Sequence, residues 1–458
     1  FSYDTWHENS DRIYRIRLDR FSQGELAEQM ATAPDALGWT IAGVFPEVKE
    51  YVLFSNYQLE GIMTRGEQRF RLENAWFATP DVFQMFSYQL IAGDPKTALA
   101  EPYTLVMSET LARTYFGDED PMGKIIESTN DRSYKVTGVM EDLPLNSHLR
   151  YDALLSATTI AAIRGEDNFN SMEPGRFWNI GVFAYLLIKE NADMQNIHAN
   201  FQGFYDKYMK PVGDAINSSF QLMSTPLVQT HFSENLSADR PKGNMAYVYI
   251  FSAVALFILL IAAINYMNMA TARSVKRARE VGIRKVAGAF RKQLIGQFLS
   301  ESLMLALIGL VIAVFVVYLL LPDFNHLAGK NLPFDLFSNP GLLLTVLGTT
   351  ILIGLLSGSY PAFYLSSFAP VTVLKGSGSK GKKGGSMRKV LVVLQFAIAI
   401  VMIIGTLVVS NQLSFLRSKD MGFRKNNMVI LELQDTAFRA KAQTFKKELL
   451  KNSNILAA

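Results

Sequence analysis

The sequence predicts a membrane protein that combines an α-helical transmembrane bundle with a large α+β extracytoplasmic domain. Four apolar stretches each approach the ~20 residues that a helix needs to cross a hydrocarbon core of ~30 Å. They cover residues 247–270, 298–321, 342–365 and 390–412. Residues 1–244 contain no such stretch, so they predict one water-exposed domain ahead of the helices.

Positive charge beside the apolar stretches predicts the orientation of the chain. The segment 273–292 carries eight Lys and Arg residues and one acidic residue, Glu280. The segment 366–389 carries six Lys and Arg residues and no acidic residue. Loops rich in Lys and Arg remain in the cytoplasm. We therefore expect a transmembrane domain over 245–365, a basic cytoplasmic linker over 366–389, and outer segments at 1–244 and 413–458.

The two ends of the chain predict that the sequence is part of a longer protein. It opens at Phe1 without the charged and apolar regions of a signal peptide, although an outer domain needs an export signal. We expect a signal or a first spanning helix upstream. Towards the other end, Met428–Leu433 alternates like a strand and Phe438–Lys451 is patterned like a helix. We therefore expect residues 390–412 to open a second repeat and 413–458 to begin a second outer domain.

Short alternating runs predict strands in the outer domain, namely Arg12–Leu18, Tyr103–Met107 and Tyr134–Val139. The segment Ser108–Phe116 predicts a helix, because Ser108 is a favourable N-cap and a glycine follows the last periodic residue. Strands interspersed with short helices indicate a mixed α+β domain.

Composition and spacing argue against several chemistries. The chain has no cysteine, which excludes disulfides, thiolate metal sites and a cysteine nucleophile. Its five histidines are scattered without ligand spacing, so we predict surface histidines or hydrogen-bonded core histidines. We expect no catalytic, metal-binding or cofactor-binding residue in this chain, and no nucleic acid partner.

One segment, Gly376–Lys383, nearly matches a phosphate-binding loop. Lys383 stands where that loop needs a Ser or Thr to bind magnesium. The segment is preceded by no predicted strand and followed by a membrane span, so it lacks the helix N-terminus that would hold a phosphate. We predict a flexible basic linker here, and no ATPase activity in this chain.

Three segments of the outer domain resemble, in order and in spacing, the MacB/FtsX-like permeases of ABC transporters. They are Phe83–Gly93, Val106–Gly123 and Val136–Leu149. Phe1–Ile16 resembles the stretch that follows the first transmembrane helix in that family. The resemblance implies a periplasmic MacB-type domain, an FtsX-type transmembrane domain and a location in the bacterial inner membrane.

The segment Arg277–Ser302 carries the most specific part of this resemblance. Glu280 precedes Arg284 by one helical turn in the favourable order, and Gly288 can end the helix. In the family, such a segment is the coupling helix that seats in a groove of the ATPase subunit. The alternative is that its cations only set the topology and bind anionic headgroups, at ~1 kcal/mol each. We assign the coupling role to Arg277, Arg279, Glu280, Gly282, Ile283, Arg284, Lys285 and Gly288.

Glu301 lies within an otherwise apolar stretch. A carboxylate at such a depth costs several kcal/mol, so it normally faces protein or water. One interpretation is a proton or substrate path. We favour a contact between helices near the cytoplasmic end, with Asn265, Asn268 or a basic side chain of the coupling segment.

The third apolar stretch carries packing signals. Gly354 and Gly358 form a G-x-x-x-G pair, which permits close approach of another helix. Pro361 is expected to kink or end the helix.

The resemblance implies a permease subunit that couples ATP hydrolysis in a separate cytoplasmic ATPase dimer to movement of the periplasmic domain, for export, efflux or lipoprotein release. ATP and magnesium would be bound by that partner, and a periplasmic or outer-membrane partner is also expected. The alternative is a membrane-anchored receptor or scaffold, or a regulator of a cell-wall enzyme, that transports nothing.

Overall fold

The computed structural model forms two compact units, Phe1–Met245 with Met428–Ala458, and Ala246–Asn427. It describes residues 3–55, 62–65, 68–72, 74–128, 132–165, 171–233, 236–329, 332–367, 382–419, 429, 431 and 440–455.

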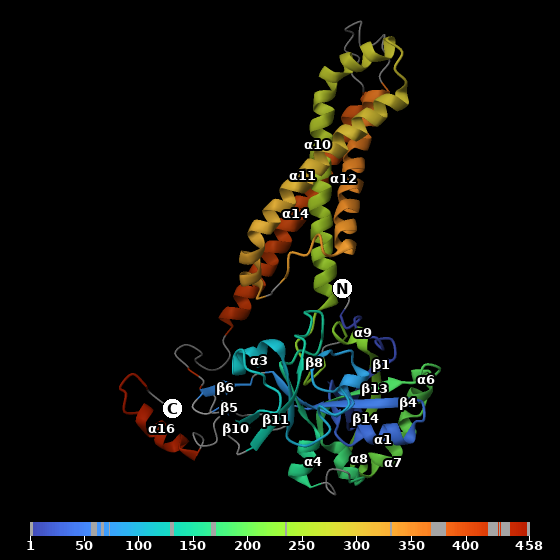
Figure 1. Cartoon of the computed structure of the whole chain (residues 1–458). Helices are drawn as coiled ribbons and strands as arrows, with labels where there is room; N and C mark the ends of the chain where they lie inside the picture. The colour runs from blue at the N-terminus through green and yellow to red at the C-terminus, as the bar shows by residue number, and fades with distance from the viewer. Residues whose placement is uncertain are drawn as a thin grey trace. The chain divides into compact units, whose positions relative to one another are not determined.

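The first unit is built on a mixed β-sheet, in which the described strands number 14 (Figure 1). The main path runs, in spatial order, through β14 (Ser218–Pro226), β1 (Ile13–Ser22), β13 (Ile180–Ile188), β4 (Val48–Ser55), β7 (Ala75–Ala78), β12 (Ala153–Ser156), β9 (Thr104–Ser108), β11 (Arg132–Met140), β10 (Ile125–Ser128), β5 (Ile62–Arg65) and β6 (Gln68–Arg71). Off this path, β2 (Glu25–Met30) pairs with β1, β3 (Ala33–Pro34) with β13, and β8 (Leu90–Ala92) with β11.

Short helices connect these strands. They are α1 (Leu37–Val44), α2 (Val82–Met85), α3 (Glu109–Phe116), α4 (Thr158–Arg164), the 3-10 helix η1 (Pro174–Trp178), α6 (Met194–Ala199), α7 (Phe201–Tyr208), α8 (Lys210–Ile216) and α9 (Leu227–Thr230). Near the end of the chain, α16 (Ala442–Leu449) buries none of its residues.

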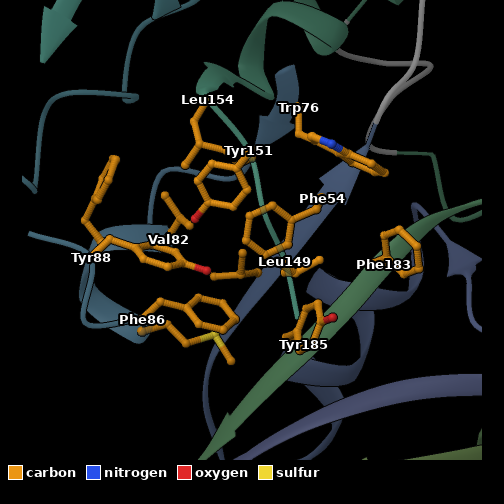
Figure 2. Packing of buried hydrophobic residues seen from close by; sticks show 14 of the residues in the cluster. Phe54, Trp76, Val82, Phe86, Tyr88, Leu149, Tyr151, Leu154, Phe183 and Tyr185 are labelled. Atoms are coloured by element: carbon orange, nitrogen blue, oxygen red, sulfur yellow. The ribbon is translucent and has the colours of Figure 1, made fainter. Parts of the chain in front are cut away.

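The central strands are apolar on both faces, as in β13, because both faces of the sheet are covered. On one face, the described buried side chains form one continuous core across the sheet (Figure 2). At its centre the ring of Phe54 lies 5.7 to 5.9 Å from the rings of Phe86, Tyr151 and Tyr185. Such ring pairs add ~1 kcal/mol each to the effect of burial.

On the opposite face, the described buried side chains form two separate cores. The first contains Leu53 and Val182 and packs under α1, α6 and α7. The second contains Phe77 and Leu155 and packs under α3 and α4. Between them lies the β4–β7 ladder, whose register joins Phe54 to Ala78 and Ser55 to Phe77. The sheet is therefore continuous on one side and divided on the other.

A buried polar cluster lies beside the continuous core. The carboxylate of Asp4 lies 2.8 Å from His148 Nδ1 and accepts a hydrogen bond from the His148 backbone N–H at 3.0 Å. His148 Nε2 lies 2.6 Å from the Tyr185 hydroxyl. His7 Nδ1 accepts from the Ser87 backbone N–H at 3.1 Å, and burial lowers the pKa of His7 to about 4. His7 and His148 are thus hydrogen-bonded core histidines, one of the two alternatives predicted.

The predicted elements of the outer domain are confirmed. The three predicted strands correspond to β1, β9 and β11, each shifted by one or a few residues. The Ser108 hydroxyl accepts a hydrogen bond from the Leu111 backbone N–H at 3.2 Å and so caps α3. Gly117 follows α3 with a φ of 62°, a conformation that glycine adopts without strain.

The second unit contains α10 (Met245–Val286), α11 (Arg291–Ala328), α12 (Pro340–Ser366) and α14 (Lys382–Ser418) (Figure 1). Each includes a segment long and apolar enough to cross a membrane, with mean hydropathy between 2.0 and 3.1. Among the described residues these four are the candidate spans, which confirms the prediction of four.

The structure corrects the extent of the coupling helix. Residues 273–292 are not a helix of their own. The first span continues without interruption to Val286, giving a helix of 42 residues and ~63 Å. Arg291 and Lys292 already belong to α11. The extension forms because residues 271–286 are rich in Ala, Arg and Lys and contain no proline.

The basic linker and the fourth span also differ from their predicted bounds. Helix α14 starts at Lys382 and ends at Ser418, so residues 382–389 are helical and not a flexible loop. Residues 413–418, predicted to begin an outer domain, continue the same helix. The interior of the linker, with most of Gly376–Lys383, lies outside the described residues, as does most of Met428–Leu433.

Candidate coupling site

The turn between α10 and α11 is closed by backbone hydrogen bonds. Gly288 has a φ of 94°, and its N–H donates to the Lys285 carbonyl at 3.1 Å. The Ala289 N–H donates to the Arg284 carbonyl at 2.9 Å. These two bonds form the motif in which a left-handed residue ends a helix. Gly288 therefore fixes the direction in which the chain leaves α10.

Three large apolar side chains are exposed around this turn, and we name them the apolar tip. They are Ile283, Val286 and Phe290, with exposed fractions of 55%, 68% and 72%. Ile283 and Val286 lie more than ten residues beyond Ala270, where the apolar span of α10 ends. Large apolar side chains exposed together among charged residues indicate an interaction surface.

Arg284 lies beside the apolar tip and is held by two partners. Its guanidinium lies 2.8 Å from the Glu280 carboxylate, one turn earlier in α10, as the sequence predicts. It also donates to Gln297 Oε1 in α11 at 2.5 Å. Both charged groups are about half exposed, so the ion pair adds only ~0.3–0.5 kcal/mol. Its main effect is to orient Arg284.

Glu301 is paired with Arg277 across α10 and α11. The two guanidinium nitrogens Nη1 and Nη2 each donate to one carboxylate oxygen at 2.7 Å. The guanidinium also lies 6.0 Å from the centre of the Phe298 ring. Of the predicted partners of Glu301, the basic side chain is therefore the one that binds it, as Arg277. This contact is between helices, as the favoured interpretation predicts.

The C-terminal end of α12 is fastened to the same region. Lys285 Nζ donates to the Ser366 carbonyl at 2.7 Å, and Arg291 Nε donates to the Ser366 hydroxyl at 3.3 Å. Cations at a helix C-terminus also interact favourably with the helix dipole. Beneath these contacts is a small core from the three helices, made of Val281, Leu294, Phe298, Ala362 and Leu365.

The glycine pair of α12 lies against α11. A Cβ added at Gly358 would lie 2.6 Å from the Ser302 hydroxyl oxygen, and one at Gly354 would lie 3.2 Å from the Ala306 Cβ. The Ser302 hydroxyl is itself 2.8 Å from the Tyr266 hydroxyl of α10. Both glycines therefore permit the close approach that their spacing predicts. Pro361 does not end α12, which continues to Ser366.

For two residues of the predicted coupling segment, the structure shows only where they lie in the helix. Gly282 is buried within α10, and Arg279 lies in α10 with a side chain outside the described part of the structure. Sequence reasoning missed Val286 and Phe290 of the apolar tip. The sequence contained a signal for Phe290, because this aromatic residue stands in a charged segment just after the glycine that ends the helix.

Fold and site define a multi-pass membrane protein with a large extracytoplasmic domain. Residues 2–203 match the MacB-like periplasmic core domain, and residues 252–370 match the FtsX-like permease C-terminal domain. The chain belongs to the MacB/FtsX-type permease family of ABC transporters.

Similar proteins agree with this assignment. The chain is 26% identical to a macrolide export ATP-binding/permease protein MacB of Bdellovibrio bacteriovorus over 59% of this chain and 38% of that protein. It is 31% identical to MacB 2 of Aeromonas hydrophila over 32% of this chain and 22% of that protein. The chain thus spans less than two fifths of the length of these curated relatives.

Two solved structures are also similar. A permease domain from Porphyromonas gingivalis is 22% identical, with a TM-score of 0.41, over 52% of this chain and 94% of that one. The periplasmic region of MacB from Actinobacillus actinomycetemcomitans is 14% identical, with a TM-score of 0.32, over 48% of this chain and 89% of that one.

Proposed function

We propose that this chain is the permease subunit of an ABC transporter in the bacterial inner membrane, and that its apolar tip docks on a separate cytoplasmic ATPase. The observation that carries the proposal is the exposure of Ile283, Val286 and Phe290 on a turn whose other side chains join three helices. Binding of headgroups accounts for the cations of this segment, but it gives no reason for exposed apolar side chains among them.

The contacts around the tip suit it to transmit movement. Arg277 joins α10 to α11, and Lys285 joins α10 to α12, so a displacement of the tip acts on all three helices. Helix α10 runs from the tip to Met245 without a break, so a displacement at one end moves the other end as well. ATP and magnesium would be bound by the ATPase, whose hydrolysis cycle supplies the movement.

The outer consequence of this movement would be export, efflux or lipoprotein release. The curated relatives are named for macrolide export, and their names assign ATP binding and permease function to one protein. In the chain described here, both family matches fall on the permease and periplasmic parts. A partner on the outer side of the membrane completes the proposed assembly.

Substitutions of the apolar and charged residues at the tip test whether it docks on the ATPase. We expect Ile283→Asp and Phe290→Asp each to weaken binding of the ATPase in mild detergent by ~5- to 30-fold, measured by co-purification, since one lost anchor is worth ~1–2 kcal/mol. Arg284→Glu combined with Glu280→Lys should also weaken it. Ile125→Asp is the matched control, because the exposed fraction of Ile125, 61%, lies between those of Ile283 and Phe290, but Ile125 lies on β10. Retention of a fully active ATPase by both tip variants would refute the proposal.

A membrane-anchored receptor is the second candidate, because the first unit contains a cavity of about 210 Å³. Its lining includes Asp35, Leu53, Ile160, Arg164 and Val182. A receptor predicts no nucleotide-dependent change in the outer domain. Limited proteolysis of this domain, with and without ATP and with the ATPase present, separates the two candidates.

A further inference from the structure

Residues 236–243 connect the first unit to α10, and we name them the exit segment. The last residue of this segment is fixed, because the Gly243 N–H donates to His231 Nε2 at 3.0 Å. A Cβ added at Gly243 would lie 2.7 Å from the same nitrogen, so the chain passes His231 closely. Asn244 alone separates Gly243 from Met245, where α10 begins. A displacement of α10 therefore reaches the exit segment within two residues.

Asp239, in the middle of the exit segment, is bound by two cations. Arg15 Nη1 of β1 donates to Asp239 Oδ1 at 2.9 Å, and Lys242 Nζ lies 2.5 Å from Asp239 Oδ2. The side chains of Arg15, Asp239 and Lys242 are 1%, 6% and 8% exposed, so solvent screens their attraction little. The Asp239 carboxylate thus joins the segment that leads into α10 to a strand of the sheet.

Arg15 lies on a strand that is paired on both sides. Its register partners are Tyr185 of β13 and Thr225 of β14. A strand that is hydrogen-bonded to two neighbours does not shift alone, because a shift would break both ladders and change their register. A force on Arg15 is therefore a force on the sheet.

The same polar chain continues across the sheet to residues 3–7, which we name the entry segment. Arg15 interacts with the Tyr185 hydroxyl. This hydroxyl lies 2.6 Å from His148 Nε2, and His148 Nδ1 lies 2.8 Å from the Asp4 carboxylate. One buried polar chain therefore connects the entry segment to the exit segment.

We propose that Asp239 is a positioning residue for the proposed transport cycle. It locks the exit segment to β1, so that movement of α10 is passed to the sheet and is not absorbed between them. This inference rests on the proposed function, since the ATPase supplies the movement. Compared with apolar residues of similar volume, buried ion pairs add little net stability, but they can specify one arrangement.

The competing explanation is that the three charges only stabilise the fold. The two explanations differ in what happens when the charges are replaced without loss of stability. If the charges only stabilise, a stable apolar replacement preserves the response of the outer domain to ATP. If Asp239 positions the exit segment, the same replacement removes that response.

Three variants separate the two explanations. Asp239→Asn removes the negative charge from between two buried cations, so it also destabilises the domain. The triple variant Arg15→Met, Asp239→Leu, Lys242→Met puts apolar side chains in place of all three charges, so the domain should remain stable. Asp35→Asn is the matched control, because Asp35 also accepts from two arginines in a site where the side chains are less than one fifth exposed. Asp35 lies outside the entry and exit segments.

Each variant of the full chain is reconstituted with the ATPase in lipid nanodiscs, and limited proteolysis of the outer domain is followed with and without ATP. We expect the ATP-dependent change in cleavage rate to be lost in Asp239→Asn and in the triple variant, and to be kept in Asp35→Asn. Co-purification of the ATPase should be unchanged in all three, because the apolar tip is intact. Urea unfolding of the triple variant should match that of the unchanged chain, which guards against an effect of stability alone.

A distance measurement tests the joint without the ATPase. The sequence has no cysteine, so Gln221→Cys on β14 and Tyr247→Cys on α10 introduce the only two thiols, both at exposed positions. Nitroxides at these positions should give one narrow distance distribution in the otherwise unchanged chain. The distribution should become at least ~2-fold wider with Asp239→Asn or the triple variant, because further arrangements of the exit segment become populated. Asp35→Asn should leave it narrow.

Three results would overturn the proposal. They are an ATP-dependent change that survives in the triple variant, equally wide distance distributions with and without Asp239, and a loss of the ATP response in Asp35→Asn as complete as in Asp239→Asn. The last result would make the effect one of stability. If the ATPase does not bind the unchanged chain, the proposed coupling fails, and the widths of the distance distributions still decide whether Asp239 locks the exit segment.

Discussion

Arg277 and Glu301 join the first two helices of the membrane unit through two parallel hydrogen bonds of 2.7 Å each. Glu301, an acidic residue in an otherwise apolar part of its helix, thereby forms a contact between two helices. Its side chains are 43% and 39% exposed, so much of the Coulomb attraction is screened.

A double-mutant cycle measures this contact. We expect Arg277→Met to destabilise the membrane unit more than Glu301→Gln does, because the former leaves a carboxylate unpaired in an apolar helix. The coupling energy should be about 1 kcal/mol, from unfolding in mixed detergent micelles. Strictly additive effects of the two changes would show that the pair contributes nothing.

The packing of α12 against α11 predicts a difference between two glycines of the same helix. Gly358→Ala should destabilise the unit by about 1–3 kcal/mol, because the new Cβ would lie 2.6 Å from the Ser302 hydroxyl oxygen. Gly348→Ala is the matched control, since no described atom lies within 4 Å of its added Cβ. It should be neutral or slightly stabilising, as Ala favours a helix. Equal thermal unfolding midpoints for the two variants would contradict the close contact.

The turn at Gly288 predicts a functional effect without a steric clash. Gly288→Ala should cost about 1 kcal/mol, because the φ of 94° disfavours a side chain although the surrounding space is open among the described atoms. Gly296→Ala, within α11, is the control. We expect only Gly288→Ala to lower the ATPase rate stimulated by the reconstituted permease. The idea fails if both variants stimulate the ATPase like the unchanged chain.

Buried His7 predicts a pH dependence in the outer unit. Its folded pKa, about 4, lies below the unfolded value of about 6.5, so folding favours the neutral ring. The stability that this provides is complete above about pH 6.5 and is lost as the pH falls towards 4, by about 2–3 kcal/mol at pH ~4.5.

His7→Asn tests this dependence, because an amide oxygen can replace Nδ1 as acceptor for the Ser87 N–H without titrating. Urea unfolding of the full chain, followed by tryptophan fluorescence, should show a flatter pH profile for the variant. An identical profile in both proteins would assign the dependence to other groups.

The sequence predicted the local features well, because they depend on neighbouring residues. The apolar stretches, the cap at Ser108 and the Glu280–Arg284 pair are examples of such features. The partner of Glu301 could only be narrowed to two kinds of side chain, an asparagine of the first span or a basic residue of the coupling segment. Choosing between them requires the rotation of α10 against α11, which no local pattern specifies.

Longer-range features were beyond sequence reasoning. The coupling segment was predicted as a helix of its own, ended by Gly288 and joined to two spans, but its fusion with the first span into one helix was not predicted. The cavity joins Asp35, Leu53, Ile160, Arg164 and Val182, which come from distant parts of the chain. These residues come together only because of the order of the strands in the sheet. The alternation of apolar and polar residues along single strands does not predict that order.

The divided face of the sheet has a consequence for cooperativity. On that face, each half of the outer unit has a separate core of its own. On the opposite face, the two halves share the continuous core. Backbone amides over the shared core should therefore exchange with deuterium only when the whole unit opens, whereas amides of α4 and α1 can exchange through openings confined to one half. A protein arranged in this way can loosen one half while the other retains its protection.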